Sequence, residues 1–171
     1  MVTFPPSEAE AYKSLGRAWA ATVTVVTSLG HERGGGALDG FTCTAFLMVS
    51  IEPPIVLVSV ANASHAHGAM RGATAIAVNF LSPDQAEISA AFARSGSDRH
   101  DVWKEVRWRA DASGVPLLEG AVGAFSATPR QFLEAGDHTL VLADVTAIHF
   151  GEAYESLVYH NRGYGRVQRH D

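Results

Sequence analysis

Short blocks of apolar and β-branched residues recur along the chain, with the spacing typical of strands. Residues 22–27 (TVTVVT) are almost wholly β-branched, and apolar runs cover residues 55–60 and 74–80. Branched side chains favour extended backbone, because they pack well on a pleated sheet. The run at 55–60 carries no polar alternation beyond Ser59 and predicts a fully buried strand. Further strand patterns cover residues 40–46, 121–128, 138–150 and 156–160.

Helical periodicity is confined to short segments. Ser7 and Glu10 form a capping-box pattern ahead of apolar residues at helical spacing up to Trp19. A short helix is expected over residues 65–71, and residues 82–85 (SPDQ) combine a capping serine, a proline and a glutamine at a second helix start. Six or seven strands with about two helices predict a mainly β, α+β fold. The pattern favours a closed β-barrel decorated by helices over a βαβ succession.

Length and composition predict a single domain over residues 1–171. Hydrophobic residues make up 47% of the chain and charged residues 18%, which is typical of a folded domain with a sizeable core. No uncharged apolar stretch is long enough to span a membrane, and the first ten residues lack the pattern of a secretory signal. The single cysteine, Cys43, fits a reducing cytoplasm. The net charge of −5, without a basic stripe, argues against nucleic acid as a partner.

Common catalytic motifs are absent from the sequence. Neither a GxGxxG fingerprint after the first strand nor a GxxxxGK[ST] loop is present, and there is no GxSxG nucleophile elbow. The glycine cluster at residues 34–36 is more typical of a hairpin loop than of a phosphate cradle. His65 and His67 have no neighbouring ligand of another kind, so no metal site is predicted. Cys43 lies within an apolar strand, where a buried, inert thiol is expected.

A set of motifs in a fixed order resembles the flavin reductase domain family, the small reductase components of two-component flavin monooxygenases. Residues 136–139 (GDHT) are the most specific of them. The others are residues 22–27, 40–46, 49–54 with the double proline, 56–60 followed by Ser64 and His67, 92–93 with 98–99, 114–121, and 158–159 with 163–164. Together they extend over nearly the whole chain.

The resemblance implies a split β-barrel of the FMN-binding type that forms a homodimer. It implies FMN or FAD as the flavin, NADH or NADPH as the hydride donor, and a flavin-dependent monooxygenase that receives the reduced flavin. Hydride transfer between the two rings needs no protein nucleophile, because the cofactors carry the chemistry. The protein has to hold the rings in contact and supply hydrogen bonds to the flavin.

The same resemblance implies a set of site residues. His138 is expected to contact the nicotinamide and to act as the catalytic residue, with Tyr164 closing over the same face. Ser64, the amides of His65 and Ala66, and the side chain of Arg99 are expected near the ribityl chain and phosphate. The flavin ring is expected against residues of the two central strands: Thr42, Cys43, Thr44, Ala45, Ser59, Val60 and Ala61.

The sequence departs from the family pattern at three places. An Asn-Ser or Ser-Ser pair is usual where this chain has Thr44-Ala45, Thr-Ser where it has Leu47-Met48, and threonine where it has Ala66. Each change removes a group that can bond the flavin, so flavin binding weakened about tenfold or more is expected. Alternatively, Leu47 and Met48 belong to the core or to the dimer interface, at no cost to the flavin site.

Two other functions remain open at this point. One is a split-barrel flavin- or haem-binding protein without turnover of NADH or NADPH, against which the GDHT segment speaks. The other is a divergent family member with non-reductase chemistry on a metabolite, which only the replaced hydroxyls favour.

Overall fold

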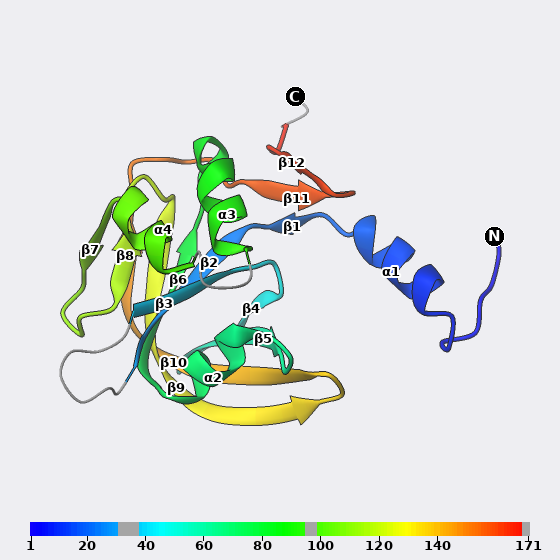
Figure 1. Ribbon diagram of the computed structural model, residues 1–171, viewed down its shortest axis with the longest axis horizontal. Coiled ribbons are helices and arrows are strands. Elements are labelled where there is room, and N and C mark those ends of the chain that lie inside the picture. Colours follow the sequence, from blue (N-terminus) through cyan, green and yellow to red (C-terminus); the bar gives the residue numbers. More distant parts are fainter. Residues whose placement is uncertain (31–37, 95–98, 169–171) are drawn as a thin grey trace.

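The computed structural model describes residues 1–30, 38–94 and 99–168, apart from the side chains of residues 99–101 (Figure 1). The glycine cluster at residues 34–36 therefore lies outside the described residues. The helices are α1 (Ala9–Arg17), α2 (His65–Arg71), the 3-10 helix η1 (Pro83–Gln85), α3 (Ala86–Phe92) and α4 (Arg99–Glu105). The strands are β1 (Ala21–Thr22), β2 (Thr24–Gly30), β3 (Leu38–Cys43), β4 (Phe46–Ile51), β5 (Pro54–Ala61), β6 (Ala73–Phe80), β7 (Trp108–Ala110), β8 (Pro116–Leu118), β9 (Gly123–Ala135), β10 (His138–Phe150), β11 (Val158–His160) and β12 (Gly163–Gly165).

A seven-stranded antiparallel sheet is the centre of the fold. Its strands follow the order β3-β2-β6-β9-β10-β5-β4, and two small sheets, β1-β11-β12 and β7-β8, lie outside it. Within the described residues β3 and β4 are the edges of this sheet and are not paired with each other. The expected closed barrel is therefore wrong, whereas the mainly β fold with few helices is confirmed. The sheet curls without completing a hydrogen-bonded ring (Figure 1).

Strand β5 alternates between buried and half-exposed positions instead of being buried throughout. Val56, Val58 and Val60 are buried in the core, and the residues between them are partly exposed. The expectation of a fully buried strand is wrong, because only one face of β5 packs on the core. The other face, which includes Ser59 and Ala61, is free to line a site.

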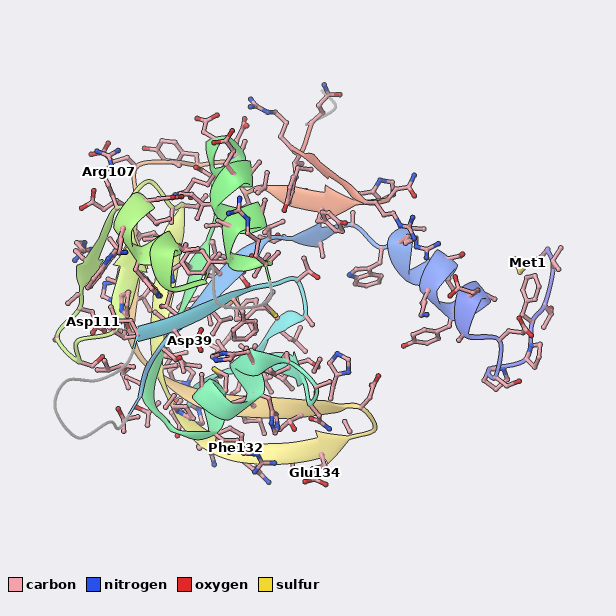
Figure 2. The ribbon with its side chains drawn as sticks, in the orientation of Figure 1. Met1, Asp39, Arg107, Asp111, Phe132 and Glu134 are labelled. Carbon is pink, nitrogen blue, oxygen red and sulfur yellow. The ribbon has the colours of Figure 1, made fainter. Side chains whose placement is uncertain are left out.

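Helix α1 stands away from the rest of the chain (Figures 1 and 2). It begins at Ala9 with no side-chain cap, so the expected capping box at Ser7 and Glu10 does not form. None of its residues is buried, and Leu15 and Trp19 are largely exposed. The four described α-helices have nine residues or fewer, and none is long and apolar enough to cross a membrane.

The helix start at residues 82–85 forms as the sequence predicts, and the polar stretch after α3 contains elements that the sequence does not predict. Ser82 and Gln85 form both bonds of a capping box, and α3 follows directly after η1. The polar residues 94–112 contain α4 and β7. Helix α4 forms because Trp103 packs edge-on against Phe92 of α3, with ring centroids 5.2 Å apart. Tertiary contact, which local polarity does not reveal, stabilises this helix.

A buried asparagine ties three strands together and provides a test of the fold. Asn79 is fully buried; its amide nitrogen donates to the Val25 carbonyl at 3.1 Å, and its oxygen accepts from the Leu118 amide at 2.8 Å. Asn79→Ala leaves the Leu118 amide without its acceptor and removes one donor to the Val25 carbonyl, so we expect the free energy of unfolding to fall by about 1–3 kcal/mol. Urea denaturation measures this change. A loss below about 1 kcal/mol would contradict the role assigned to this side chain.

Candidate active site

A cleft of about 420 Å³ opens where the ends of β3 and β5 meet α2 and α3. Its size falls within the range of small-molecule sites. Five alanines and two phenylalanines form much of its wall, and seven of the lining residues have polar side chains. The lining residues are Phe41, Thr42, Cys43, Thr44, Ala45, Ser59, Val60, Ala61, Ala63, Ser64, His65, Ala66, Phe92, Ala93, Arg94 and His138.

Strand register brings these distant segments together. His138, the first residue of β10, pairs with Ala61, the last residue of β5. The turn after β3 is held to β5 by the Ser59 amide, which donates to the Ala45 carbonyl at 3.0 Å. Because the side chain of Val60 is buried in the core, this residue meets the cleft mainly through its backbone. The side chains of Ser59 and Ala61 lie on the other face of β5.

Two hydroxyls in the cleft are already used by the protein. Thr42 Oγ1 donates to the Ser89 carbonyl at 2.5 Å, and Ser64 Oγ donates to the Ala61 carbonyl at 2.7 Å. With their single protons engaged, both oxygens can only accept hydrogen bonds from a ligand. Donors to a ligand's carbonyl oxygens must therefore come from other groups, such as backbone amides or the hydroxyls of Thr44 and Ser59.

His138 is held at the cleft by its sequence neighbour. Its Nδ1 lies 2.8 Å from a carboxylate oxygen of Asp137. This hydrogen bond and the charge of the imidazole lower the pKa of Asp137. The ionised carboxylate accepts from Nδ1–H, which leaves Nε2 as the ring nitrogen able to meet a ligand.

Cys43 lines the cleft, but its thiol is not reactive. Burial raises the pKa of Cys43 from its ordinary value of 9.0 to about 11, against smaller opposing contributions from backbone hydrogen bonds. We expect a thiol-specific disulfide reagent at pH 8 to label native Cys43 far more slowly than urea-unfolded Cys43. Since the folded pKa is the higher one, the stability this group contributes is complete below pH 9 and is lost towards pH 11. Equal labelling of the native and unfolded protein would contradict the burial.

The cleft wall includes one arginine and a histidine that contacts a carboxylate. His65 Nδ1 lies 3.1 Å from a carboxylate oxygen of Asp39, and the exposed Arg94 lines the same cleft. Arg94 was missed by sequence reasoning, as were Phe41 and Ala63. The end of α3 was its only signal, because residues directly after a helix often point back to the helix's neighbours.

Eleven of the thirteen residues expected at the flavin site line this one cleft. Of the two others, Tyr164 lies elsewhere, and the side chain of Arg99 is outside the described residues. Tyr164 is not part of the cleft wall: its hydroxyl lies 2.9 Å from Oγ of the buried Ser89, and its ring packs against Tyr159. Arg99 begins α4, and its side chain lies outside the described residues.

The departures from the family pattern separate into two groups. Ala66 is buried and lines the cleft, as do Thr44 and Ala45. Leu47 and Met48, on edge strand β4, are 59% and 58% exposed and do not line it. Their alternative placement in the core is therefore wrong, and only the first group lines the cleft.

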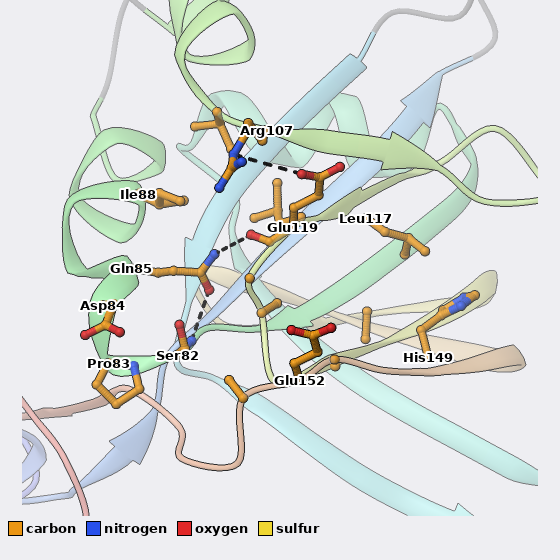
Figure 3. A pocket seen from close by; sticks show the side chains of 18 of the residues that line it. Ser82, Pro83, Asp84, Gln85, Ile88, Arg107, Leu117, Glu119, His149 and Glu152 are labelled. Carbon is orange, nitrogen blue, oxygen red and sulfur yellow. Dashed lines mark hydrogen bonds and ion pairs between the residues drawn. The ribbon is translucent and has the colours of Figure 1, made fainter.

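A larger cavity, of about 1000 Å³, lies away from this cleft (Figure 3). It includes none of the expected flavin-site residues. Several of its polar groups bond one another: Gln85 Nε2 donates to the Glu119 carbonyl at 2.8 Å, and Arg107 lies 4.0 Å from the Glu119 carboxylate. Size alone does not identify the functional site, because the residues expected at the flavin line the smaller cleft and not this cavity.

Comparison with known proteins agrees with this geometry. Residues 15–168 match the flavin reductase like domain. The NADH:FMN oxidoreductase of Rhodococcus qingshengii is 35% identical over 159 residues, covering 91% of this chain and 80% of that protein. A probable flavin reductase of Rhizobium meliloti (strain 1021) is 35% identical over 147 residues, covering 86% of this chain but only 45% of that protein.

The fold has close counterparts among solved structures. The NADH:FAD oxidoreductase of Streptomyces globisporus C-1027, in complex with NAD and FAD fragments, superposes with a TM-score of 0.87 at 27% identity. The alignment covers 98% of each chain. This chain therefore belongs to the flavin reductase like domain family.

Proposed function

We propose that this protein is an oxidoreductase in which NADH or NADPH reduces FMN or FAD at the cleft beside His138. The observation that supports this most is the convergence of eleven expected residues on that cleft, with His138 opposite Ala61 at its wall. Family membership supports the same activity. The chain covers less than half of one curated relative, so the proposal concerns the reductase unit that this chain contains.

The residues present fit a flavin. Ala45, Ala61 and Ala66 line the cleft with small side chains, so a flat ring can approach the backbone. Arg94 supplies positive charge at the cleft wall, where a phosphate would be favoured. Neither feature depends on Arg99, so Arg94 is proposed as the phosphate-binding arginine within the described residues.

The protein's part in the reaction is to bind and orient. Hydride transfer from nicotinamide to flavin would be the chemistry that the two cofactors supply. His138, oriented by Asp137, would hold the carboxamide of the nicotinamide through Nε2. The apolar wall excludes water from the contact between the rings. No side chain has to form a covalent bond, and the protonated thiol of Cys43 is in keeping with that.

The decisive experiment is an assay of NADH and NADPH oxidation with added FMN, FAD or riboflavin. We expect turnover with at least one flavin, and weaker use of riboflavin than of FMN, because riboflavin lacks the phosphate that Arg94 would meet. Desalting should remove the flavin, because the hydroxyl protons of Thr42 and Ser64 are engaged and Ala66 supplies no hydroxyl. Absence of nicotinamide oxidation with all three flavins would overturn the proposal; bound flavin without turnover would favour a binding protein instead.

We also propose that the chain forms a homodimer. Edge strand β4 exposes four large apolar side chains, Leu47, Met48, Val49 and Ile51, and Leu15 of α1 and Trp19 just after it are also exposed. Large apolar side chains that gather on a surface mark interaction sites. Light scattering should report twice the mass of one chain, and Met48→Lys should shift it towards the monomer. A monomer at micromolar concentration would contradict this proposal.

The recipient of the reduced flavin is proposed to be a flavin-dependent monooxygenase. One relative is the reductase component of a flavin-dependent trigonelline monooxygenase, and another is the reductase subunit of a stachydrine N-demethylase. An open cleft and weak flavin contacts suit a reductase that must release its product. The expected cytoplasmic location and the single-domain organisation over residues 1–171 remain predictions.

A further inference from the structure

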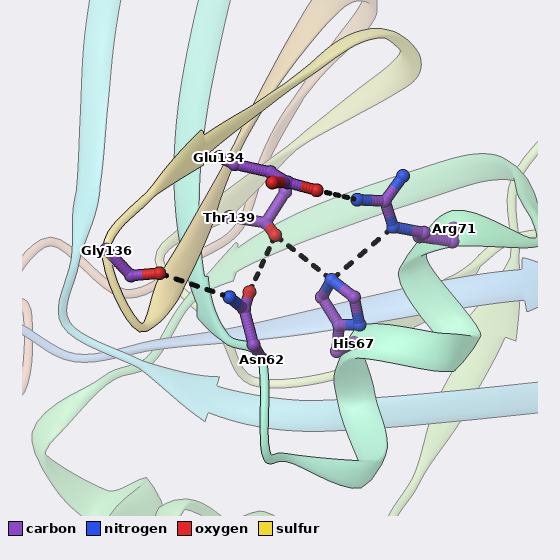
Figure 4. Close-up of polar contacts among 6 residues, drawn as sticks. All are labelled: Asn62, His67, Arg71, Glu134, Gly136 and Thr139. Atoms are coloured by element: carbon purple, nitrogen blue, oxygen red, sulfur yellow. Dashed lines mark hydrogen bonds and ion pairs between the residues drawn. The ribbon is translucent and has the colours of Figure 1, made fainter.

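A short hydrogen-bonded network lies directly behind one wall of the cleft (Figure 4). Its members are Asn62 after β5, His67 on α2 and Thr139 on β10. Each is the sequence neighbour of a residue that lines the cleft, although none of the three lines it. The network therefore supports the wall without being able to touch a ligand in the cleft.

The direction of each hydrogen bond in this network can be assigned. Asn62 Nδ2 faces the Gly136 carbonyl at 3.4 Å, which places its amide oxygen towards Thr139. That oxygen lies 2.7 Å from Thr139 Oγ1 and can only accept, so it takes the single hydroxyl proton. Thr139 Oγ1 must then accept from His67 Nε2, 3.0 Å away. His67 is thereby held with its proton on Nε2.

This assignment also decides how Arg71 is held. Arg71 Nε lies 3.4 Å from His67 Nε2. Because Nε2 carries the proton that it donates to Thr139, it cannot also accept a hydrogen bond from Arg71. Arg71 has other partners: its guanidinium lies 3.7 Å from the Glu134 carboxylate and 5.5 Å from the centre of the Phe132 ring. It packs beside His67, and the buried bond to Thr139 is the one that orients the imidazole.

Thr139 joins the three elements that form this wall. It is 1% exposed and directly follows His138, so any shift of its hydroxyl moves the residue expected at the nicotinamide. The backbone amide of Asn62 donates to the Asp137 carbonyl at 2.9 Å, which fixes the same hairpin from the β5 side. His67 extends the connection to α2, two residues beyond His65.

We propose that Thr139 is a positioning residue for hydride transfer: its hydroxyl holds the His138 hairpin against α2 and the end of β5. This inference rests on the proposed function. Without the hydroxyl, Asn62 and His67 lose their common partner, and the hairpin is free to shift relative to the flavin wall. Binding on the nicotinamide side should suffer first, because His138 is the cleft residue adjacent to Thr139.

Thr139→Val tests this with a side chain of nearly equal shape. We expect the apparent KM for NADH to rise about three- to tenfold, as for the loss of one neutral hydrogen bond, with the Kd of FMN changed less than about twofold. Thr139→Ser keeps the hydroxyl and should restore the wild-type KM. An unchanged KM in Thr139→Val, or an equal loss of FMN affinity, would overturn the inference.

Thr27→Val is the matched control. Thr27 is also fully buried, and its hydroxyl donates to the Pro116 carbonyl at 2.6 Å, but it does not line the cleft. It should lower the melting temperature without moving the KM for NADH. If both valine variants raise that KM equally, Thr139 acts only through general stability and the inference fails.

Two further measurements keep the test decisive. Asn62 is exposed, so Asn62→Ala should fold even if Thr139→Val does not, and it should raise the KM for NADH in the same direction. Nitrogen NMR of the imidazoles should find His67 with its proton on Nε2 in the wild type and a mixture of tautomers in Thr139→Val. This measurement needs no turnover: a wild type without NADH oxidation refutes the proposed function, whereas an unchanged tautomer refutes the network.

Discussion

Ala61→Leu is expected to weaken FMN binding about ten- to a hundredfold while the protein still folds. Ala61 lies on the half-exposed face of β5, lines the cleft and pairs with His138. A leucine there places three additional carbons in a cleft of about 420 Å³, where a flat ring has to approach the backbone. The residue replaced carries no polar group, so the effect comes from volume alone. Quenching of FMN fluorescence on titration with protein measures the Kd.

The control for this variant is Ala112→Leu. Ala112 is exposed in the connection between β7 and β8 and lines none of the described cavities. The same substitution there should leave the Kd of FMN unchanged. If Ala61→Leu binds FMN as the wild type does, the flavin lies elsewhere, and the larger cavity beside Gln85 becomes the next candidate.

His138→Ala is expected to lower kcat/KM for NADH about tenfold or more, with the Kd of FMN nearly unchanged. The imidazole is 43% exposed and oriented by Asp137, so its removal takes away a contact on the open side of the cleft and leaves the flavin wall intact. Steady-state assays at saturating FMN, together with flavin titrations, separate the two effects. Equal losses for both substrates would mean that His138 contacts the flavin instead.

His149→Ala is a matched control on the same strand. His149 also makes one side-chain hydrogen bond, between Nε2 and Ser126 Oγ at 2.9 Å, but it lines the larger cavity and not the cleft. Its loss should leave kcat/KM for NADH unchanged. Asp137→Asn provides an intermediate case, because a neutral amide can still face Nδ1 but no longer attracts the imidazole as a charge. We expect a smaller loss than in His138→Ala.

The loss of FMN binding in Ala61→Leu and the loss of NADH turnover in His138→Ala should be separable, because different residues of the cleft carry them. Flavin and nicotinamide would meet different residues: Ala61 and Ala45 on the strand walls, and His138 at the hairpin. The two groups share the backbone pairing of β5 with β10, so the fold places them together without any side chain serving both. Thr139, behind His138, is expected to affect only the second group.

The sequence by itself determined the elements whose signals are local. Strand β10 spans the expected residues 138–150 and α2 spans 65–71, because β-branched runs, turn residues and short helical periodicity act within a few positions. The ordered motifs also identified the family, and with it eleven residues that the fold brings to one cleft. The order of the motifs located the site residues even where the type of a single residue gave little indication of its role.

Only the tertiary structure decided how those residues are used. The curled sheet stays open at β3 and β4, α4 depends on Trp103 packing against Phe92, and Leu47 and Met48 are exposed and do not line the cleft. The hydroxyl of Thr42 donates to the carbonyl of Ser89, 47 positions later in the chain. Strand pairing and hydrogen bonding across such separations depend on where the backbone folds, and local sequence does not encode the partner. For the same reason Arg94 and the Asn62–Thr139–His67 network could be found only in three dimensions.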